Sequence, residues 1–155
     1  MILLNFISFL LTFQITLDNL PIEQASIEGF EFGMSTGQIF EKLGTPNIID
    51  TLIDEIGDGL EFQQLRYDGL TLSVKNGVIE DYDLRSEKYQ LKFNSLKIGD
   101  PRSKVVSLFP NSYKNRWKSG QNTEIIDVTI NNADYYLKIV FNDDRITNIF
   151  TWTPS

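Results

Sequence analysis

The side chains that could carry chemistry in this chain are carboxylates and amines, because its 155 residues include no histidine and no cysteine. Histidine is the commonest general base and transition-metal ligand, and the cysteine thiolate is a common nucleophile. Without cysteine there is also no disulfide and no cysteine-based zinc site. Catalysis by carboxylates or lysine is the chemistry that remains, and we expect neither a metal nor a cofactor.

The acidic stretch at residues 54–59 resembles a calcium loop in composition. An EF-hand loop that begins at Asp54 and has Gly59 as its sixth residue needs an oxygen ligand at position three and Glu at position twelve. Those positions hold Ile56 and Leu65, so the pattern fails. We predict a solvated loop here, with a loose carboxylate site as the alternative.

Other carboxylates accompany two expected hairpin turns: Glu80, Asp81 and Asp83 follow the first, and Asp143 and Asp144 lie in the second. Two carboxyl groups about 5 to 10 Å apart in a cleft can hydrolyse glycosidic bonds. Acidic residues beside tight turns, however, more often serve local hydrogen bonding and solubility. A carboxylate-dependent hydrolase is therefore only the third-ranked function.

The composition is that of a folded, acidic globular protein. An apolar fraction of 41% and 19 aromatic residues (11 Phe, 6 Tyr and 2 Trp) supply a dense core. The length suits one domain, or two half-size units that share a core. A net charge of -7 argues against nucleic acid as a partner, because phosphate binding needs clustered Lys and Arg. The same charge suits steering toward a basic protein.

The first 13 residues form an apolar run with the length of a signal-peptide core, too short to span a bilayer. No Lys or Arg precedes the run, and no A-x-A cleavage pattern follows it. We favour residues 1–14 as a possible signal peptide, which predicts a periplasmic or secreted protein without an integral membrane segment. The alternatives are a buried first strand or a misassigned start codon, in a cytoplasmic protein.

An internal repeat is the strongest signal in the chain. Residues 32–46 reappear in outline as residues 98–111, with Gly33 and Gly99 separated by 66 positions. Residues 70–79 reappear as residues 137–146, displaced by 67 positions. A repeat constrains the whole architecture, so we predict two copies of one unit, at residues 15–86 and 87–155.

Each copy is expected to begin with a short helix. Ser35 and Gln38 have the spacing of a capping box, and Asp100 is the expected cap of the second helix, with Pro101 at its first helical position. Glycine and proline at residues 44–46, and Pro110 with residue 111, are expected to end the helices. The predicted buried faces are Ile39, Phe40 and Leu43 in one helix and Val105, Val106 and Phe109 in the other.

An antiparallel sheet is expected to support each helix. The predicted strands cover residues 61–67, 70–75 and 78–84 in the first copy, and residues 124–130, 135–141 and 145–152 in the second. Asp68-Gly69 and Asn76-Gly77 suit type I′ turns. Residues 14–17 and 89–93 are expected to add a short strand ahead of each helix. The predicted fold class is α+β, with two tandem repeats that each pack a short helical segment on a three- to four-stranded meander.

The residues Gly33-Met34-Ser35, a short helix and then Leu43-Gly44-Thr45-Pro46 resemble a known module. The pattern is similar to the outer-membrane assembly lipoproteins of the SmpA/OmlA type, and the tandem pair resembles the beta-lactamase inhibitor protein fold. The resemblance covers about half of the chain, and the second copy keeps Gly99, the apolar helix face and the last hairpin. It implies a bacterial protein that binds other proteins without catalysis, often through an exposed sheet face.

Strand parity selects one set of candidate contact residues. Phe62 and Arg66 in the first copy, and Tyr136 and Lys138 in the second, are expected to point away from the core. Aromatic and Arg side chains on a polar face are typical of protein-binding hot spots. The alternative is that another segment covers Phe62 and that water solvates the polar side chains.

Residues 111–124 provide the second set of candidates. Tyr113 and Trp117 alternate there with Lys114, Arg116 and Lys118, which makes a basic patch in an acidic protein. Such a mixture can contact acidic partners, sugars or nucleotides. The alternative is that Trp117 plugs the junction of helix and sheet while the amines are solvated.

These observations rank three functions. The first is a non-enzymatic, protein-binding module of a bacterial envelope, adaptor-like or inhibitor-like, that recognises a partner protein through the exposed sheet face. The second is a cytoplasmic immunity-type protein that neutralises a basic toxin. The hydrolase is third.

Overall fold

The computed structural model describes residues 15–53 and 61–154, and it has an α+β fold. The strands are β1 (Asn19–Leu20), β2 (Ile48–Ile53), β3 (Glu61–Tyr67), β4 (Leu70–Lys75), β5 (Val78–Leu84), β6 (Trp117–Lys118), β7 (Thr123–Ile130), β8 (Tyr136–Asn142) and β9 (Arg145–Trp152). The helices are α1 (Ile22–Ala25), α2 (Thr36–Leu43), α3 (Arg102–Leu108) and α4 (Pro110–Lys114), with a 3₁₀ turn at Phe93–Ser95.

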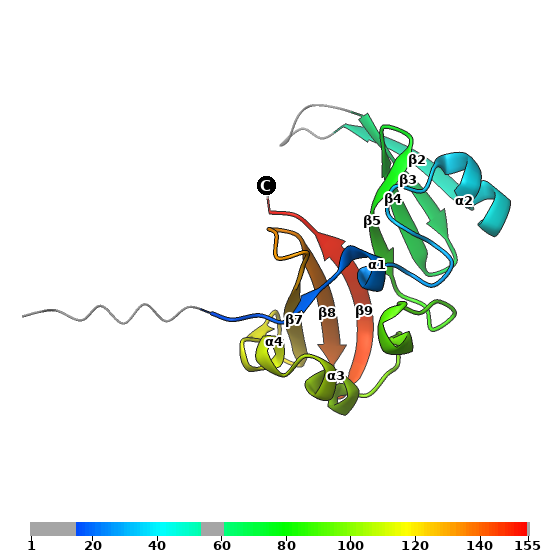
Figure 1. The fold of residues 1–155 in the computed structure, drawn as a ribbon. Coiled ribbons are helices and arrows are strands. Elements are labelled where there is room, and N and C mark those ends of the chain that lie inside the picture. Colours follow the sequence, from blue (N-terminus) through cyan, green and yellow to red (C-terminus); the bar gives the residue numbers. More distant parts are fainter. Residues whose placement is uncertain (1–14, 54–60, 155) are drawn as a thin grey trace, which may run out of the picture.

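The described strands form one nine-stranded sheet in the order β1-β7-β8-β9-β5-β4-β3-β2, with β6 added to β7. All neighbouring strands are antiparallel except β1 and β7, which are parallel. The meanders β3-β4-β5 and β7-β8-β9 meet where β5 pairs with β9 through Asp83–Phe150 and Leu84–Ile149 alone. Beyond these pairs the strands diverge, so the two meanders splay apart (Figure 1).

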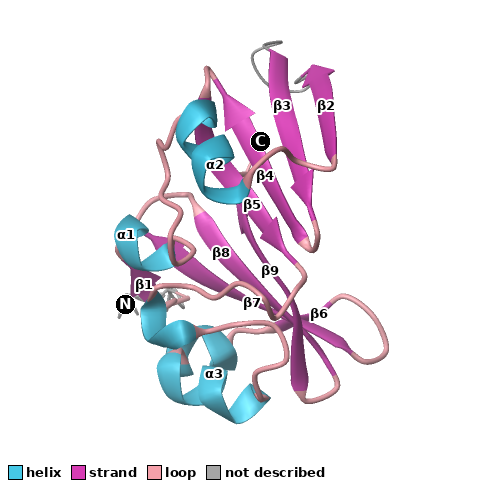
Figure 2. Ribbon diagram, turned by 90° about the vertical axis from the view of Figure 1, so that its right-hand side faces the viewer, coloured by secondary structure: helices cyan, strands magenta, loops and turns pink. Residues whose placement is uncertain are grey.

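The core lies on one face of the sheet, beneath the helices. Figure 2 shows α2 and α3 on the same side of the strands. Ile39 of α2, Ala25 of α1 and Val105 of α3 are fully buried in one apolar cluster with the inward side chains of both meanders. Those inward residues include Leu65, Leu70, Leu72, Val74, Leu137, Ile139, Phe141 and Ile149. The opposite face carries none of the described helices, and we call it the outer face.

The predicted strands of both meanders are confirmed. β3, β4, β5 and β9 have the expected bounds, β7 begins one residue early, and β8 is displaced by one residue. Asn76 and Gly77 both have positive φ, as a type I′ turn requires. The type I′ prediction for Asp68-Gly69 is wrong, because Gly69 has a φ of 71° whereas Asp68 keeps a negative φ.

The first helix is also confirmed. The Ser35 hydroxyl accepts from the Gln38 backbone N–H, and the Gln38 side chain accepts from the Ser35 N–H, which completes the capping box. Ile39 is buried, while Phe40 and Leu43 pack at the margin of the core. Gly44 ends the helix with a φ of 76°.

The predicted start of the second helix is wrong. The N-cap of α3 is Pro101 and not Asp100, so the helix begins one residue later than expected, and Pro101 makes no side-chain capping bond. The Asp100 carboxylate instead accepts from the Lys97 backbone N–H at 3.0 Å and from the Lys104 ammonium at 2.7 Å. Asp100 therefore binds the Lys97 N–H and the Lys104 ammonium and does not cap the free N–H groups at the start of α3.

The predicted end of the second helix is also corrected. Pro110 does follow the last turn of α3, but it then begins α4, because proline is tolerated at the first position of a new helix. Val105 and Phe109 are buried as expected, whereas Val106 is 36% exposed and faces solvent.

The remaining segments differ from expectation or lie outside the described residues. Strand β2 was not predicted. Residues 89–93 form isolated bridges, from Gln90 to Lys97 and from Ile27 to Leu91, and not a regular strand. Residues 15–17 are not a strand, and the parallel strand β1 follows them. The candidate signal peptide at 1–14 and the acidic stretch at 54–59 lie outside the described residues.

Glycines close the edge of each meander. The Gly33 N–H donates to the Ile79 carbonyl of β5 at 2.8 Å, and the Gly99 N–H donates to the Ile146 carbonyl of β9 at 2.8 Å. The φ angles are 80° at Gly33 and 85° at Gly99, a region that residues with a Cβ rarely adopt. The backbone ahead of α2 and α3 thus satisfies one carbonyl on the edge of β5 and one on the edge of β9, which water would otherwise bind.

None of the helices in the part of the chain that the structure describes is long and apolar enough to cross a membrane.

Candidate functional site

The outer face brings the four strand residues selected by parity onto one surface. The register pairs Phe62 with Lys75 and Arg66 with Thr71 in the first meander. In the second it pairs Tyr136 with Trp152 and Lys138 with Phe150. The side chains of directly paired residues point to the same face of a sheet, so both meanders contribute to this surface.

An aromatic cluster occupies the β6–β9 part of the outer face. It consists of Trp117, Tyr136 and Trp152, whose rings surround the Lys138 ammonium. The distances from the Lys138 nitrogen to the ring centroids are 5.5 Å for Trp117, 5.9 Å for Tyr136 and 4.5 Å for Trp152. The rings of Tyr136 and Trp152 are 6.0 Å apart. These separations are those of cation–π and aromatic contacts.

A carboxylate completes the cluster and balances its charge. Asp127 of β7 accepts from the Lys138 ammonium at 2.8 Å through one oxygen. Its other oxygen accepts from the Trp117 indole N–H at 3.2 Å. Lys138 is only 9% exposed, because the rings cover it. The buried amine is therefore paired, and its contacts fix the orientations of the surrounding rings.

The rings nevertheless remain accessible on their outer side. Trp117 is 44% exposed and Trp152 is 42% exposed. A hollow of about 370 Å³ lies beside them. Its wall consists of the three rings with Ile15, Leu17, Asn115, Asp127 and Pro154. Large aromatic side chains that are half exposed side by side are unusual on a soluble monomer and indicate a contact surface.

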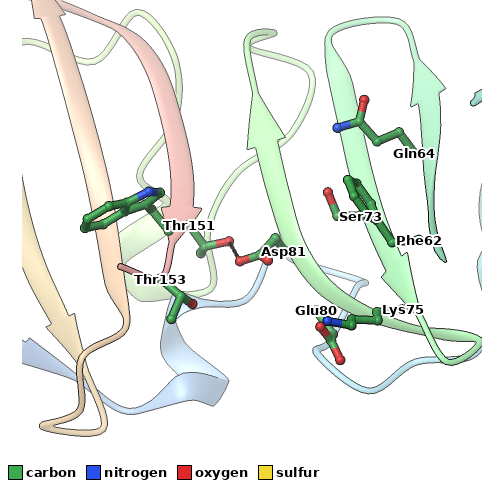
Figure 3. Close-up of a pocket in the computed structure, with 9 residues that line it drawn as sticks. Phe62, Gln64, Ser73, Lys75, Glu80, Asp81, Thr151 and Thr153 are labelled. Carbon is green, nitrogen blue, oxygen red and sulfur yellow. Dashed lines mark hydrogen bonds between the residues drawn. The ribbon is translucent and has the colours of Figure 1, made fainter. Parts of the chain in front are cut away.

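A groove lies where β5 and β9 diverge. Two adjoining hollows, of about 370 and 490 Å³, share Gln64, Ser73, Asp81 and Thr151 and together form this groove. Phe62 lines the first hollow, and Arg66 lines the second. Figure 3 shows the groove between the two meanders, with the Thr151 hydroxyl donating to the Asp81 carboxylate across its floor at 2.9 Å.

Trp152 connects the two parts of the outer face, because it lines both the groove and the hollow of the aromatic cluster. Trp152, Asp127 and Phe150 were not among the contact residues predicted from the sequence. Simple alternation was a misleading signal for Trp152, because Trp152 has the same parity as the buried Ile146 and an irregularity in the β8–β9 register reverses the faces between them. The position of Trp152 opposite Tyr136 depends on the register of β8 and β9.

The segment 111–124 divides between two sites. Trp117 joins the aromatic cluster and is 44% exposed, so the alternative in which it plugs the junction of helix and sheet is wrong. Tyr113 lies on α4, where the Arg116 guanidinium is 4.4 Å from its ring centroid. Arg116 also pairs with Glu124 at 3.3 Å. Tyr113 and Arg116 thus form contacts within the chain at the end of α4.

Arg102 of α3 organises that second group. It pairs with Glu124 and donates to the Tyr113 hydroxyl at 3.4 Å. Its guanidinium lies 5.0 Å from the centroid of Phe141. The hydrogen bond from Arg102 lowers the pKa of the Glu124 carboxyl below its ordinary value, although partial burial opposes the shift. This arrangement stabilises the packing of α3 and α4 on the sheet.

Two carboxylates of β5, Asp81 and Asp83, have partners within the chain. Asp81 accepts from Thr151 and from the Tyr135 hydroxyl, at 2.9 and 3.1 Å. Burial and the nearby Asp81 charge raise the pKa of Tyr135, which keeps its phenol a neutral donor. Asp83 pairs with Arg85 at 2.9 Å. Among the described residues, no three His, Cys, Asp or Glu side chains gather as a metal site would require.

Comparisons with known proteins bear on the fold alone. No family model matches the chain, and no curated protein matches it. Among solved structures, the chain is similar to an extracellular protein containing a SCP domain from Bacillus anthracis str. Ames, with a TM-score of 0.51 and 14% sequence identity. The similarity covers 78% of this chain and 43% of that one, so the chain spans less than half of that protein.

Proposed function

We propose that this protein is a non-enzymatic binding module that recognises a partner protein through its outer sheet face. The observation that carries the proposal is the aromatic cluster, in which Trp117 and Trp152 stand half exposed beside Tyr136. Trp and Tyr dominate the energetics of protein interfaces, because they bury a large area at a small entropic cost.

The rigidity of the cluster supports the same role. The Lys138 ammonium and the Asp127 carboxylate hold the rings by contacts that exist before any partner arrives. Side chains fixed in advance lose less entropy on binding, which improves affinity. A ring cluster without such support would have to be ordered at the cost of part of the binding energy.

The groove supplies the polar complement of the cluster. Gln64, Ser73 and Thr151 place amide and hydroxyl groups along it, between Phe62 and Trp152. An apolar centre beside polar groups that can form hydrogen bonds is the usual composition of a protein interface. The groove is the part of the face on which we expect specificity for the partner to depend.

Two copies of one unit build this face in our proposal. The matched hydrogen bonds support the repeat: Ile79 donates to Met34 at 2.9 Å, and Ile146 donates to Asp100 at 3.0 Å. Another bond from each unit corresponds, with Thr36 donating to Gly77 and Arg102 donating to Asp144. The resemblance to the SmpA/OmlA module and to the beta-lactamase inhibitor protein fold implies the same arrangement and a bacterial envelope role. Localisation in the periplasm or outside the cell is part of this proposal.

The test is affinity capture from an extract of the native host with the full chain as bait. The wild type is compared with a Trp117→Ala/Trp152→Ala variant and with Val106→Ala, an exposed position on α3 of the helical side. We expect a partner that the wild type and Val106→Ala retain and that the double variant loses. A partner that all three retain equally would contradict recognition through the aromatic cluster.

A direct measurement supplements the capture. The chain has two tryptophans, and both belong to the aromatic cluster. Titration with the purified partner should therefore change the intrinsic tryptophan fluorescence, because binding removes the rings from water. An unchanged emission spectrum at saturating partner would place the contact elsewhere. A basic toxin as the captured partner would favour the immunity-type alternative, which the net charge of -7 suits.

A further inference from the structure

Strand β2 is an edge without the usual protection. It ends the sheet order, with β3 on one side and none of the described strands on the other. Natural edge strands are commonly short or carry charges, proline or a bulge that prevent pairing with another chain. The six residues of β2 pair regularly with β3, include no proline and contain one charged residue, Asp50. The other edge is different, since β1 and β6 have two residues each.

Large apolar side chains project from both faces of β2. Ile48 and Leu52 lie on the outer face and are 52% and 38% exposed. Ile49 and Ile53 lie on the helical face and are 48% and 60% exposed. A helix or a loop docked on one face would leave the other pair in water. A strand that continues the sheet beside β2 reaches both faces.

We propose that β2 pairs antiparallel with β2 of a second copy of this chain, across a two-fold axis, and thereby joins two sheets into one. The self-complementary pattern of the strand favours a second copy as the occupant. Residues directly opposite each other in an antiparallel pair have side chains on the same face of the sheet. The two-fold axis must therefore pass midway between one residue of β2 and the same residue of the other copy. The possible central residues in the middle of β2 are Asp50, Thr51 and Leu52.

Charge and overlap select the register centred on Thr51. A centre at Asp50 would place two like carboxylates directly opposite each other, which is destabilising. A centre at Leu52 would shorten the overlap of the two strands. With Thr51 at the centre, Ile49 lies opposite Ile53 and Thr51 opposite Thr51. Apolar and threonine pairs of this kind stabilise neighbouring strands.

The remaining charge is compatible with this register. Asp50 lies opposite Leu52 of the other copy, and its carboxylate already pairs with Arg66 of its own chain at 2.8 Å. Because the axis is perpendicular to the sheet, the outer faces of both copies lie on the same side. The dimer therefore leaves the aromatic cluster open, and this inference does not depend on the proposed function.

Analytical ultracentrifugation of the full chain tests the dimer. At about 100 μM, a concentration that populates even a weak dimer, we expect twice the monomer mass of 17.8 kDa. Ile49→Lys should raise the dissociation constant at least tenfold, because Lys at an edge opposes pairing. Val106→Lys, a change at a 36% exposed position on α3, should leave the dissociation constant unchanged. A monomeric wild type, or a dimer that survives Ile49→Lys, would overturn the proposal.

Single cysteines in this cysteine-free chain test the register. Directly opposite Cα atoms in an antiparallel pair are about 4.5 to 5.5 Å apart, which is within disulfide range. Oxidised Thr51→Cys should form a covalent dimer at least tenfold faster than Thr147→Cys, an exposed control on β9. Equal rates would overturn β2 pairing. Faster cross-linking by Leu52→Cys than by Thr51→Cys would overturn the register.

Discussion

The ammonium nitrogen of Lys138 lies 4.5 Å from the centroid of the Trp152 ring, so the most enclosed amine of the outer face supports one of its most accessible aromatic rings. The contact couples stability to recognition. Loss of the lysine changes the surroundings of both tryptophans and leaves the Asp127 carboxylate without its ion-pair partner.

Lys138→Met should lower the free energy of unfolding by about 2 kcal/mol, because it leaves a partly buried carboxylate unpaired. Adding Asp127→Asn should restore part of that loss, since the unpaired charge is then gone. Urea unfolding followed by tryptophan fluorescence measures both changes. A loss below about 0.5 kcal/mol would mean that water screens the pair as it does at an open surface.

Arg102→Ala should lower the free energy of unfolding by about 1 to 2 kcal/mol, because one side chain ties α3 to β7 and to the β8–β9 turn. The lost contacts include the ion pairs with Glu124 and Asp144 and the stacking on Phe141. Lys114→Ala, at an exposed position of α4, is the matched control and should change stability by less than about 0.5 kcal/mol. Similar losses in both variants would remove the special role of Arg102.

Stability should fall in acid partly through Glu124. Its pKa in the folded protein is lowered by the hydrogen bond from Arg102. The contribution is therefore complete above the unfolded pKa of about 4.3 and is lost as the pH falls through the lower folded value. Glu124→Gln should flatten this part of the pH profile of unfolding. Parallel profiles for wild type and Glu124→Gln between about pH 2 and 5 would contradict the assignment.

Gly69→Ala should destabilise the protein by more than about 2 kcal/mol, and Gly77→Ala by about 1 kcal/mol. Both glycines have positive φ, at 71° and 79°. A Cβ at Gly69 would lie 2.3 Å from the Ser86 Cβ, whereas at Gly77 it meets no atom within 4 Å. Thermal unfolding of the two variants separates the steric cost from the backbone cost. Equal losses would show that the contact with Ser86 relaxes freely.

Local chemistry made several elements predictable from the sequence. The strands 61–67, 70–75 and 78–84 were recognisable because apolar residues alternate along them and glycine-containing turns separate them. The capping box at Ser35 and Gln38 was recognisable because its partners are three residues apart. The role of Pro110 was not predictable, because proline can either follow the end of one helix or begin the next. In the structure it begins α4, which packs on β7.

The amino-acid sequence by itself determined the α+β class, most strands and the side of the sheet on which the strand candidates point. Only the tertiary structure decided that Trp117, Asp127 and Trp152 meet around Lys138, and that β5 and β9 pair briefly and then diverge to open the groove. The physical reason is the range of the interactions. Turns, caps and alternation act between neighbours in the chain, whereas cross-strand contacts depend on the register of segments that the sequence separates.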